Sequence, residues 1–184
     1  MMRPFLALVL SLIVGSVAAA EPAAFHRVED AGLRYGVPPS WERVPAPSNM
    51  RAAQYRVSGA TPGADAEVVL FFFGKGQGGS TEANLDRWYA QFTQPDGRSS
   101  REAAVVTVRT VHGLKVTSVD LQGTYTAAQM GGGATGPRPD TRMLAAAIEG
   151  PGGPWFLRLI GPAATVGAVR GDFDQVLLSV EHHQ

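Results

Sequence analysis

Apolar residues recur with two different periods along the chain, and each period predicts a different element. In residues 66–73, AEVVLFFF, both alternating sets of positions are apolar, which predicts a central strand buried on both faces. Residues 82–92 place apolar side chains at the spacing of one buried helical stripe. Those side chains are Leu85, Trp88, Tyr89 and Phe92. A similar stripe predicts a second helix, and its members are Phe173, Val176, Leu177 and Val180.

Two pairs of apolar runs predict hairpins: residues 103–111 with 114–125, and residues 143–150 with 155–161. The connections inside each pair are too short for a parallel crossover, so antiparallel pairing is expected. We therefore predict an α+β domain with a mostly antiparallel sheet of six or seven strands. Because inner strands are apolar on both faces, helices are expected to cover both sides in an α-β-α sandwich.

The stretch from Ala127 to Asp140, AAQMGGGATGPRPD, contains four glycines and two prolines and is predicted to be a long loop. Arg138 and Arg142 lie at its exit, and arginine is enriched in protein interfaces. The loop is therefore a candidate interaction loop. The alternative is a connection without a binding role.

The amino-terminal residues have the pattern of a secretory signal peptide. Arg3 precedes an apolar core at residues 5–14, and the segment ends in an Ala-x-Ala cleavage site at residue 20. The core is shorter than the roughly 20 residues that span a bilayer. We expect cleavage of residues 1–20, a loosely held lead-in at 21–31, and a single domain at 32–184. That domain is predicted to be periplasmic or secreted, without stable membrane insertion.

Composition excludes several kinds of chemistry. The chain has no cysteine, which rules out disulfides, thiol catalysis and thiolate metal sites. Cleavage would remove Arg3, leaving 15 of the 16 basic residues against 16 acidic ones, a net charge of 15 − 16 = −1. That balance does not favour nucleic acid. His182 and His183 are adjacent and would not share a helix face, so no metal site and no cofactor are predicted.

Residues 74–80, GKGQGGS, pose the main functional question. They match the dinucleotide pattern GxGxxG between a predicted strand and a predicted helix, and Asp96 follows at roughly the distance of the ribose contact. Asp96 lies in a Gln-Pro-Asp-Gly turn, however, and a hairpin follows instead of a second parallel strand. Lys75 also comes too early for a phosphate-binding loop of the Gly-Lys-Ser type. A nucleotide site is therefore disfavoured.

A simpler anion site remains a hypothesis, because backbone N–H groups at a helix start attract anions. Its candidate ligand-binding residues are Lys75, Gly76, Gly78, Gly79, Ser80, Asn84 and Arg87. The alternative is a tight turn that requires glycine, with Ser80 or Thr81 capping the helix. An enzymatic alternative, a hydrolase or transferase, would combine Ser80 and His112 with an acid such as Asp86. The leading interpretation predicts no catalytic residues.

Two segments carry a resemblance to known proteins: GQGGS-x3-N-L-x-R-W at Gly76–Trp88, and F-L-x-L-x-GP-x2-T at Phe156–Thr165. Over residues 32–181 the chain resembles a group of uncharacterised exported bacterial proteins with the PsbP-like fold. The resemblance implies an α-β-α sandwich, which photosystem accessory proteins and a nuclear Ran-binding protein also use. It implies binding or assembly without catalysis, and it supplies no catalytic residues.

These observations predict an exported, non-enzymatic binding or accessory domain that recognises a protein partner or a small anionic ligand. A structural factor of the cell envelope is a third interpretation.

Overall fold

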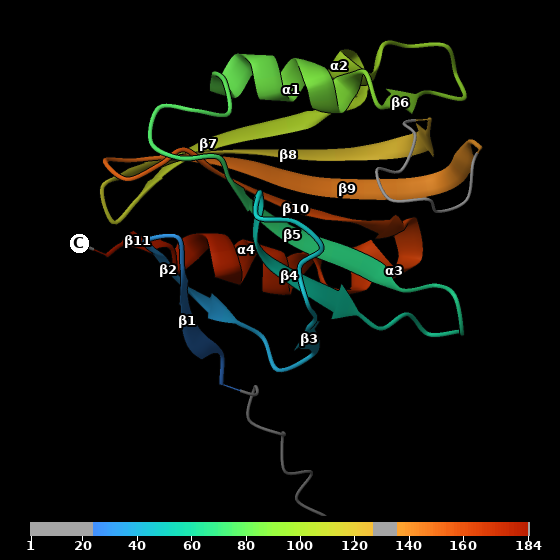
Figure 1. Cartoon of the computed structure of the whole chain (residues 1–184). Coiled ribbons are helices and arrows are strands. Elements are labelled where there is room, and N and C mark those ends of the chain that lie inside the picture. Colours follow the sequence, from blue (N-terminus) through green and yellow to red (C-terminus); the bar gives the residue numbers. More distant parts are fainter. Residues whose placement is uncertain (1–23, 127–135, 184) are drawn as a thin grey trace, which may run out of the picture.

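The computed structural model describes residues 24–126 and 136–183 (Figure 1). The predicted signal peptide and the centre of the predicted interaction loop lie outside these ranges.

Within the described residues, eight strands form one large sheet in which every pairing is antiparallel. In spatial order they are β3 (Trp41–Arg43), β4 (Arg51–Val57), β5 (Ala66–Phe72), β10 (Trp155–Pro162), β9 (Arg138–Glu149), β8 (Leu114–Tyr125) and β6 (Phe92–Thr93), with β7 (Val105–Val111) also paired to β8. The prediction of an α+β fold with a mostly antiparallel sheet is confirmed. The predicted six or seven strands become eight because β3 and β6, of three and two residues, are too short to show a period.

Both predicted hairpins are present. In the turn between β7 and β8, His112 and Gly113 have φ of 46° and 80°, the left-handed conformation that two-residue hairpin turns require. β9 pairs with β10 from Thr141 to Ile148, but the strand itself begins earlier, at Arg138. The last residues of the predicted loop are therefore strand, because Arg138 pairs with Tyr125 across a register shift in β8.

A second, three-stranded sheet contains β1 (His26–Asp30), β2 (Leu33–Val37) and β11 (Glu181–His182). Residues 26–30 were expected to belong to a loose lead-in, and this expectation is wrong. The segment has little apolar periodicity, so its order comes from backbone pairing with β2. Side chains also connect the small sheet to the large one. The hydroxyl of Tyr35 on β2 donates to Asp30 of β1 at 2.8 Å and lies 2.9 Å from the hydroxyl of Tyr55 on β4.

Two apolar cores lie on opposite faces of the large sheet. On one face α1 (Thr81–Tyr89) and α2 (Ser100–Ala103) cover the strands, and on the other lie α3 (Ala163–Ala168) and α4 (Arg170–Leu178) with the small sheet (Figure 1). β10 supplies both cores by alternation: Trp155 and Leu157 face α4, and Phe156 and Ile160 face α1. We call these the α4 face and the α1 face.

The first helix begins where the sequence predicts, but the helices end before the last residue of each predicted stripe. The Ser80 hydroxyl accepts a hydrogen bond from Ala83 N at 3.1 Å, so the predicted cap at this position is confirmed. α1 ends at Tyr89, which places Phe92 in β6. α4 ends at Leu178 and is capped by Ser179, so the buried Val180 lies just after the helix. α3 was not predicted, because its sequence contains glycine and β-branched residues, which have low helix propensity.

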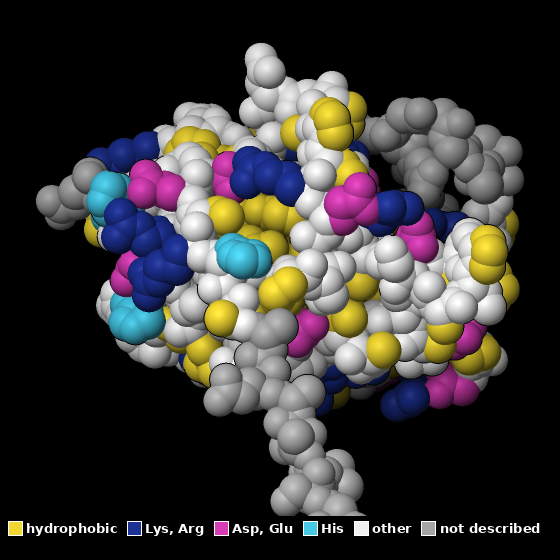
Figure 2. Space-filling view, turned by 90° about the horizontal axis from the view of Figure 1, so that it is seen from below, with side chains coloured by type: hydrophobic (Ala, Val, Ile, Leu, Met, Phe, Trp, Pro, Cys, Tyr) yellow, Lys and Arg dark blue, Asp and Glu magenta, His cyan; other side chains and the backbone are white. Residues whose placement is uncertain are grey.

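Charged side chains of both signs surround the small sheet. Arg34 lies 3.4 Å from Glu29 and 3.5 Å from Glu181, and Glu29 also lies 3.0 Å from His183. Figure 2 shows this side of the molecule with basic, acidic and histidine side chains intermingled. Such a surface presents no field of a single sign to a charged partner.

Candidate functional site

The glycines of residues 74–80 are required by the backbone. Gly74, Gly76, Gly78 and Gly79 have φ of 101°, 70°, 88° and 84°, a region that other residues rarely adopt. A Cβ on Gly78 would lie 2.8 Å from ring atoms of Phe73 and of Phe156. Turn formation and close packing therefore explain these positions without a ligand.

Asn84, a predicted ligand-binding residue, fastens this loop to α1. It is only 4% exposed, and its Nδ2 donates to the carbonyls of Gly78 at 3.0 Å and Ser80 at 2.9 Å. Its Oδ1 accepts from Arg87 Nη1 at 2.7 Å. The amide is thus engaged within the chain, and Arg87 is held beside it.

A shallow hollow of about 310 Å³ lies between the glycine loop and the turn that joins β9 to β10. Gly76, Gly79 and Ser80 line it, together with the acids Glu82 and Glu149, while Lys75 and Arg87 are not among its lining residues. The anion site that the sequence suggested here stays a prediction. Two carboxylates in the hollow count against it, because like charge repels an anion.

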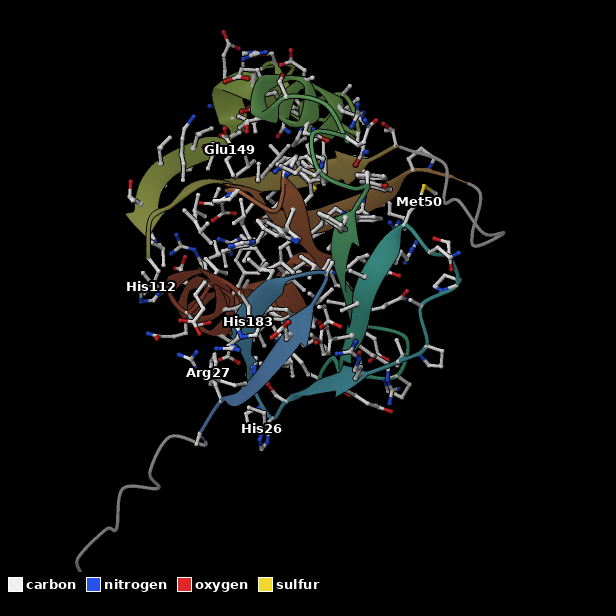
Figure 3. The ribbon with its side chains drawn as sticks, turned by 60° about the vertical axis from the view of Figure 1, so that its left-hand side comes forward. His26, Arg27, Met50, His112, Glu149 and His183 are labelled. Carbon is white, nitrogen blue, oxygen red and sulfur yellow. The ribbon has the colours of Figure 1, made fainter. Side chains whose placement is uncertain are left out.

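Glu149, which lines this hollow under α1, is held by two partners (Figure 3). Its carboxylate accepts a hydrogen bond from Thr81 Oγ1 at 2.8 Å and lies 3.2 Å from Lys115 Nζ. The Thr81 hydrogen bond, with help from Lys115, lowers the pKa of Glu149. The acid therefore remains charged at neutral pH.

The sheet has no place for a dinucleotide. β5 pairs antiparallel with β4 and β10, and β7 pairs antiparallel with β8, so the strand after α1 does not return beside β5. Asp96 lies in the predicted turn, where its Oδ1 accepts from the backbone N of Arg98 at 3.1 Å. The parallel strand–helix–strand unit that binds dinucleotides is absent from the described residues.

The residues of the enzymatic alternative have separate partners. His112 Nδ1 lies 3.0 Å from the Val180 carbonyl oxygen, Ser80 caps α1, and Asp86 forms an ion pair with Arg101. A general base must lie within hydrogen-bond reach of its nucleophile, and no hydrogen bond joins these side chains in the described chain.

Across residues 24–126 and 136–183, we find no group of three or more His, Asp or Glu side chains arranged to hold a metal ion. Within the same residues, each helix is too short or too polar to traverse a bilayer.

Arg138 and Arg142, the two arginines of the candidate interaction loop, lie on different surfaces. Arg142 donates from Nε and Nη2 to the two carboxylate oxygens of Asp120, at 2.8 and 2.6 Å. Arg138 instead places its guanidinium 4.7 Å from the ring centroid of Tyr125, a residue of the α1 face. The structure therefore does not bring the pair together.

A second arginine group was not predicted. Arg51 and Arg158 both lie over the ring of Phe71, with Cζ 5.7 and 5.5 Å from its centroid. We call Arg51, Phe71, Tyr125, Arg138 and Arg158 the arginine–aromatic cluster. The sequence held one signal for it, a single arginine inside the apolar strand WFLRLIG.

The two outer edges of the large sheet also differ. β3 has only three residues, two of them charged, Glu42 and Arg43. β7 has seven residues, VVTVRTV, and its Val105, Val106 and Val108 are 61%, 44% and 60% exposed. Natural proteins usually protect such an edge with short strands, charge or proline.

No protein-family model and no curated protein matches the sequence. The solution structure of cyanobacterial PsbP (CyanoP) from Synechocystis sp. PCC 6803 is similar, with a TM-score of 0.54 over 92% of this chain and 99% of that chain. The chain has a PsbP-like fold. This confirms the resemblance, and at 14% identity the similarity concerns the fold alone. The crystal structure of a Pseudomonas aeruginosa protein of unknown function covers 88% of this chain and 99% of its own, with a TM-score of 0.48 and 9% identity.

Proposed function

We propose that this protein is an exported, non-enzymatic accessory domain that recognises a protein partner by adding a strand of that partner to the edge of β7. The observation that carries the proposal is the unprotected edge: seven residues, a single charge at Arg109, no proline and three exposed valines. The signal-peptide pattern and the PsbP-like sandwich, with helices on both faces, support an exported accessory role.

The chemistry of β7 indicates the kind of partner. An edge strand offers unpaired backbone N–H and C=O groups, so the partner must present an extended segment with its own groups free. Val106 and Val108, two residues apart, point to the same face and favour apolar side chains at alternate positions of that segment. Valine and threonine also favour the extended conformation, so β7 already has the backbone shape with which an added strand would pair.

The test uses a photo-crosslinking amino acid at Val108 in the intact, exported protein in its native cells. We expect crosslinks to one protein through an extended segment of it, identified by mass spectrometry. Val106→Lys should abolish these crosslinks, because lysine blunts an edge strand without entering the core. Leu178 is an equally exposed apolar residue on α4, so Leu178→Lys is the matched control and should leave them intact.

Two results would overturn the proposal. One is crosslinking that Val106→Lys and Leu178→Lys affect equally. The other is a dimer of the purified protein that Val106→Lys dissociates, which would show that β7 pairs with a second copy of this chain instead of a different protein.

A further inference from the structure

Arg158 has an unusual position for an arginine. It lies on β10, a central strand, where it is paired with Val69 of β5 and Ala145 of β9. Its Nε is buried and has no hydrogen-bond partner in the described part of the chain. Burial lowers the pKa of Arg158, the opposite of what a carboxylate partner would do. Arg158 as a whole is of intermediate exposure, so the residue is not closed off from the surface.

The surroundings of Arg158 are positively charged. Arg51 and Arg138 act on it with the same sign, and both belong to the arginine–aromatic cluster. The acid of this group is Glu67, whose Oε1 already accepts from Arg51 Nη1 at 2.7 Å and from Gln54 Nε2 at 2.8 Å. Three guanidinium groups therefore face one carboxylate, a balance of 3 − 1 = +2.

Among the described residues, Glu67 is the only acid that acts on Arg158. Residues 127–135, which join β8 to β9, contain no Asp or Glu. A buried N–H without an acceptor is costly, and natural proteins keep few such groups, so each one calls for a partner such as a water, an ion or a ligand.

Aromatic side chains surround the same guanidinium. Phe71 lies under both Arg51 and Arg158, and its ring stacks on Phe73 with centroids 6.2 Å apart and an interplanar angle of 4°. Phe73 is exposed, and so is Met50, which immediately precedes β4 (Figure 3). A ligand on Arg158 would therefore have apolar surface beside its charged end.

We propose that the arginine–aromatic cluster binds a carboxylate carried by an apolar group. The carboxylate accepts from the guanidinium of Arg158, since the planar fork of arginine fits a carboxylate with two parallel hydrogen bonds. The apolar group lies against Phe71 and Phe73. This site is separate from the β7 edge and does not depend on the proposed function.

The experiment titrates the full-length mature protein with 3-phenylpropionate and follows amide and arginine Nε–H resonances by NMR. We expect shifts at the Nε–H of Arg158 and at the amides of Val69, Phe71 and Ala145. Arg158→Met should weaken binding about tenfold or more, because it removes charge-assisted hydrogen bonds. Arg56→Met is the matched control: it removes an arginine of β4 whose partner is Glu42, and it should leave affinity unchanged.

Two further ligands test the chemistry of the site. The neutral 3-phenylpropanamide should bind far more weakly because it lacks the charge, and sulfate should do so because it lacks the apolar group. A peptide ending in phenylalanine, compared with the free acid, separates the two sources of the carboxylate. Tighter binding of the peptide would assign a protein terminus, and tighter binding of the free acid would assign a small molecule.

The proposal is overturned if 3-phenylpropionate shifts resonances elsewhere and not at Arg158, or if Arg158→Met and Arg56→Met bind it equally. It is also overturned if sulfate or the amide binds as tightly. The shift map of the wild-type protein is sufficient on its own, so the test does not depend on the folding of the Arg158→Met variant.

Discussion

Arg142 and Arg158 lie on neighbouring strands of one sheet, and their environments are opposite. On the α4 face, Arg142 meets Asp120 with two short hydrogen bonds, and this contact raises the pKa of Arg142. On the α1 face, Arg158 lies over the ring of Phe71 between Val69 and Ala145, and burial lowers its pKa. The same residue type, one strand apart, is thus stabilised in one place and left uncompensated in the other.

The difference lies in the acceptors, because both side chains are largely buried. Asp120 stands on β8, directly beside the strand of Arg142, and Arg170 adds a further ion pair at 3.3 Å. The strand positions on either side of Arg158 are Val69 and Ala145. The fold supplies the acceptor of Arg142, whereas no described residue accepts from Nε of Arg158.

The largest effect is expected when Arg142, the arginine paired with an acid of the chain, is removed. Arg142→Met leaves Asp120 with Arg170 alone, and Arg142 and Asp120 are only about a fifth exposed (21% and 20%). We expect a loss of about 2 kcal/mol in the free energy of unfolding, measured by urea denaturation. Arg56→Met, at an exposed ion pair, is the control and should not measurably change the midpoint. Equal midpoints for both variants would show that the Asp120 contact contributes nothing.

Arg158→Met should change the free energy of unfolding in the opposite direction. Methionine keeps an apolar stem and removes a desolvated charge, so we expect the ligand-free protein to gain about 1 kcal/mol in the free energy of unfolding. The same urea experiment measures it. A loss comparable to that of Arg142→Met would mean that the guanidinium contact with Phe71 stabilises the fold, and that no external acceptor is required.

The contrast also explains which features the sequence predicts. The hairpins, the helix start at Ser80 and the PsbP-like fold follow from local periodicity, short connections and matching segments. The arginine–aromatic cluster does not, because Arg51, Phe71 and Arg158 come from three strands and meet only through sheet register. The sequence also suggested a wrong grouping of Arg138 and Arg142 for a related reason. They are close in sequence, but within β9 their side chains lie on different surfaces.

Arg51, like Arg142, is paired with an acid of the chain, and a substitution at that acid would leave it unpaired. Glu67→Gln removes the charge that accepts from Arg51, the arginine that shares the Phe71 ring with Arg158. We expect a loss of about 0.5 kcal/mol in unfolding free energy and an affinity for 3-phenylpropionate that rises about threefold, since the cluster becomes more positive. NMR titration measures the affinity. Weaker binding in Glu67→Gln would place the carboxylate away from this cluster.

The smallest effect on stability is expected at Glu149, an acid whose partners, like that of Arg142, belong to the chain itself. The Thr81 hydrogen bond and Lys115 lower the pKa of Glu149 from its ordinary 4.5. A lowered pKa means that the folded state binds the proton less readily, so this contribution is present above pH 4.5 and is lost as the pH falls through the lower, folded value. Glu149→Gln removes it. The stability difference between wild type and variant should therefore shrink by a few tenths of a kcal/mol between pH 6 and pH 3, because the side chain is 41% exposed and solvent screens the interaction. Thr81→Val removes the principal cause and should reproduce most of the change, whereas parallel pH profiles for all three proteins would show that Glu149 is not stabilised by these partners.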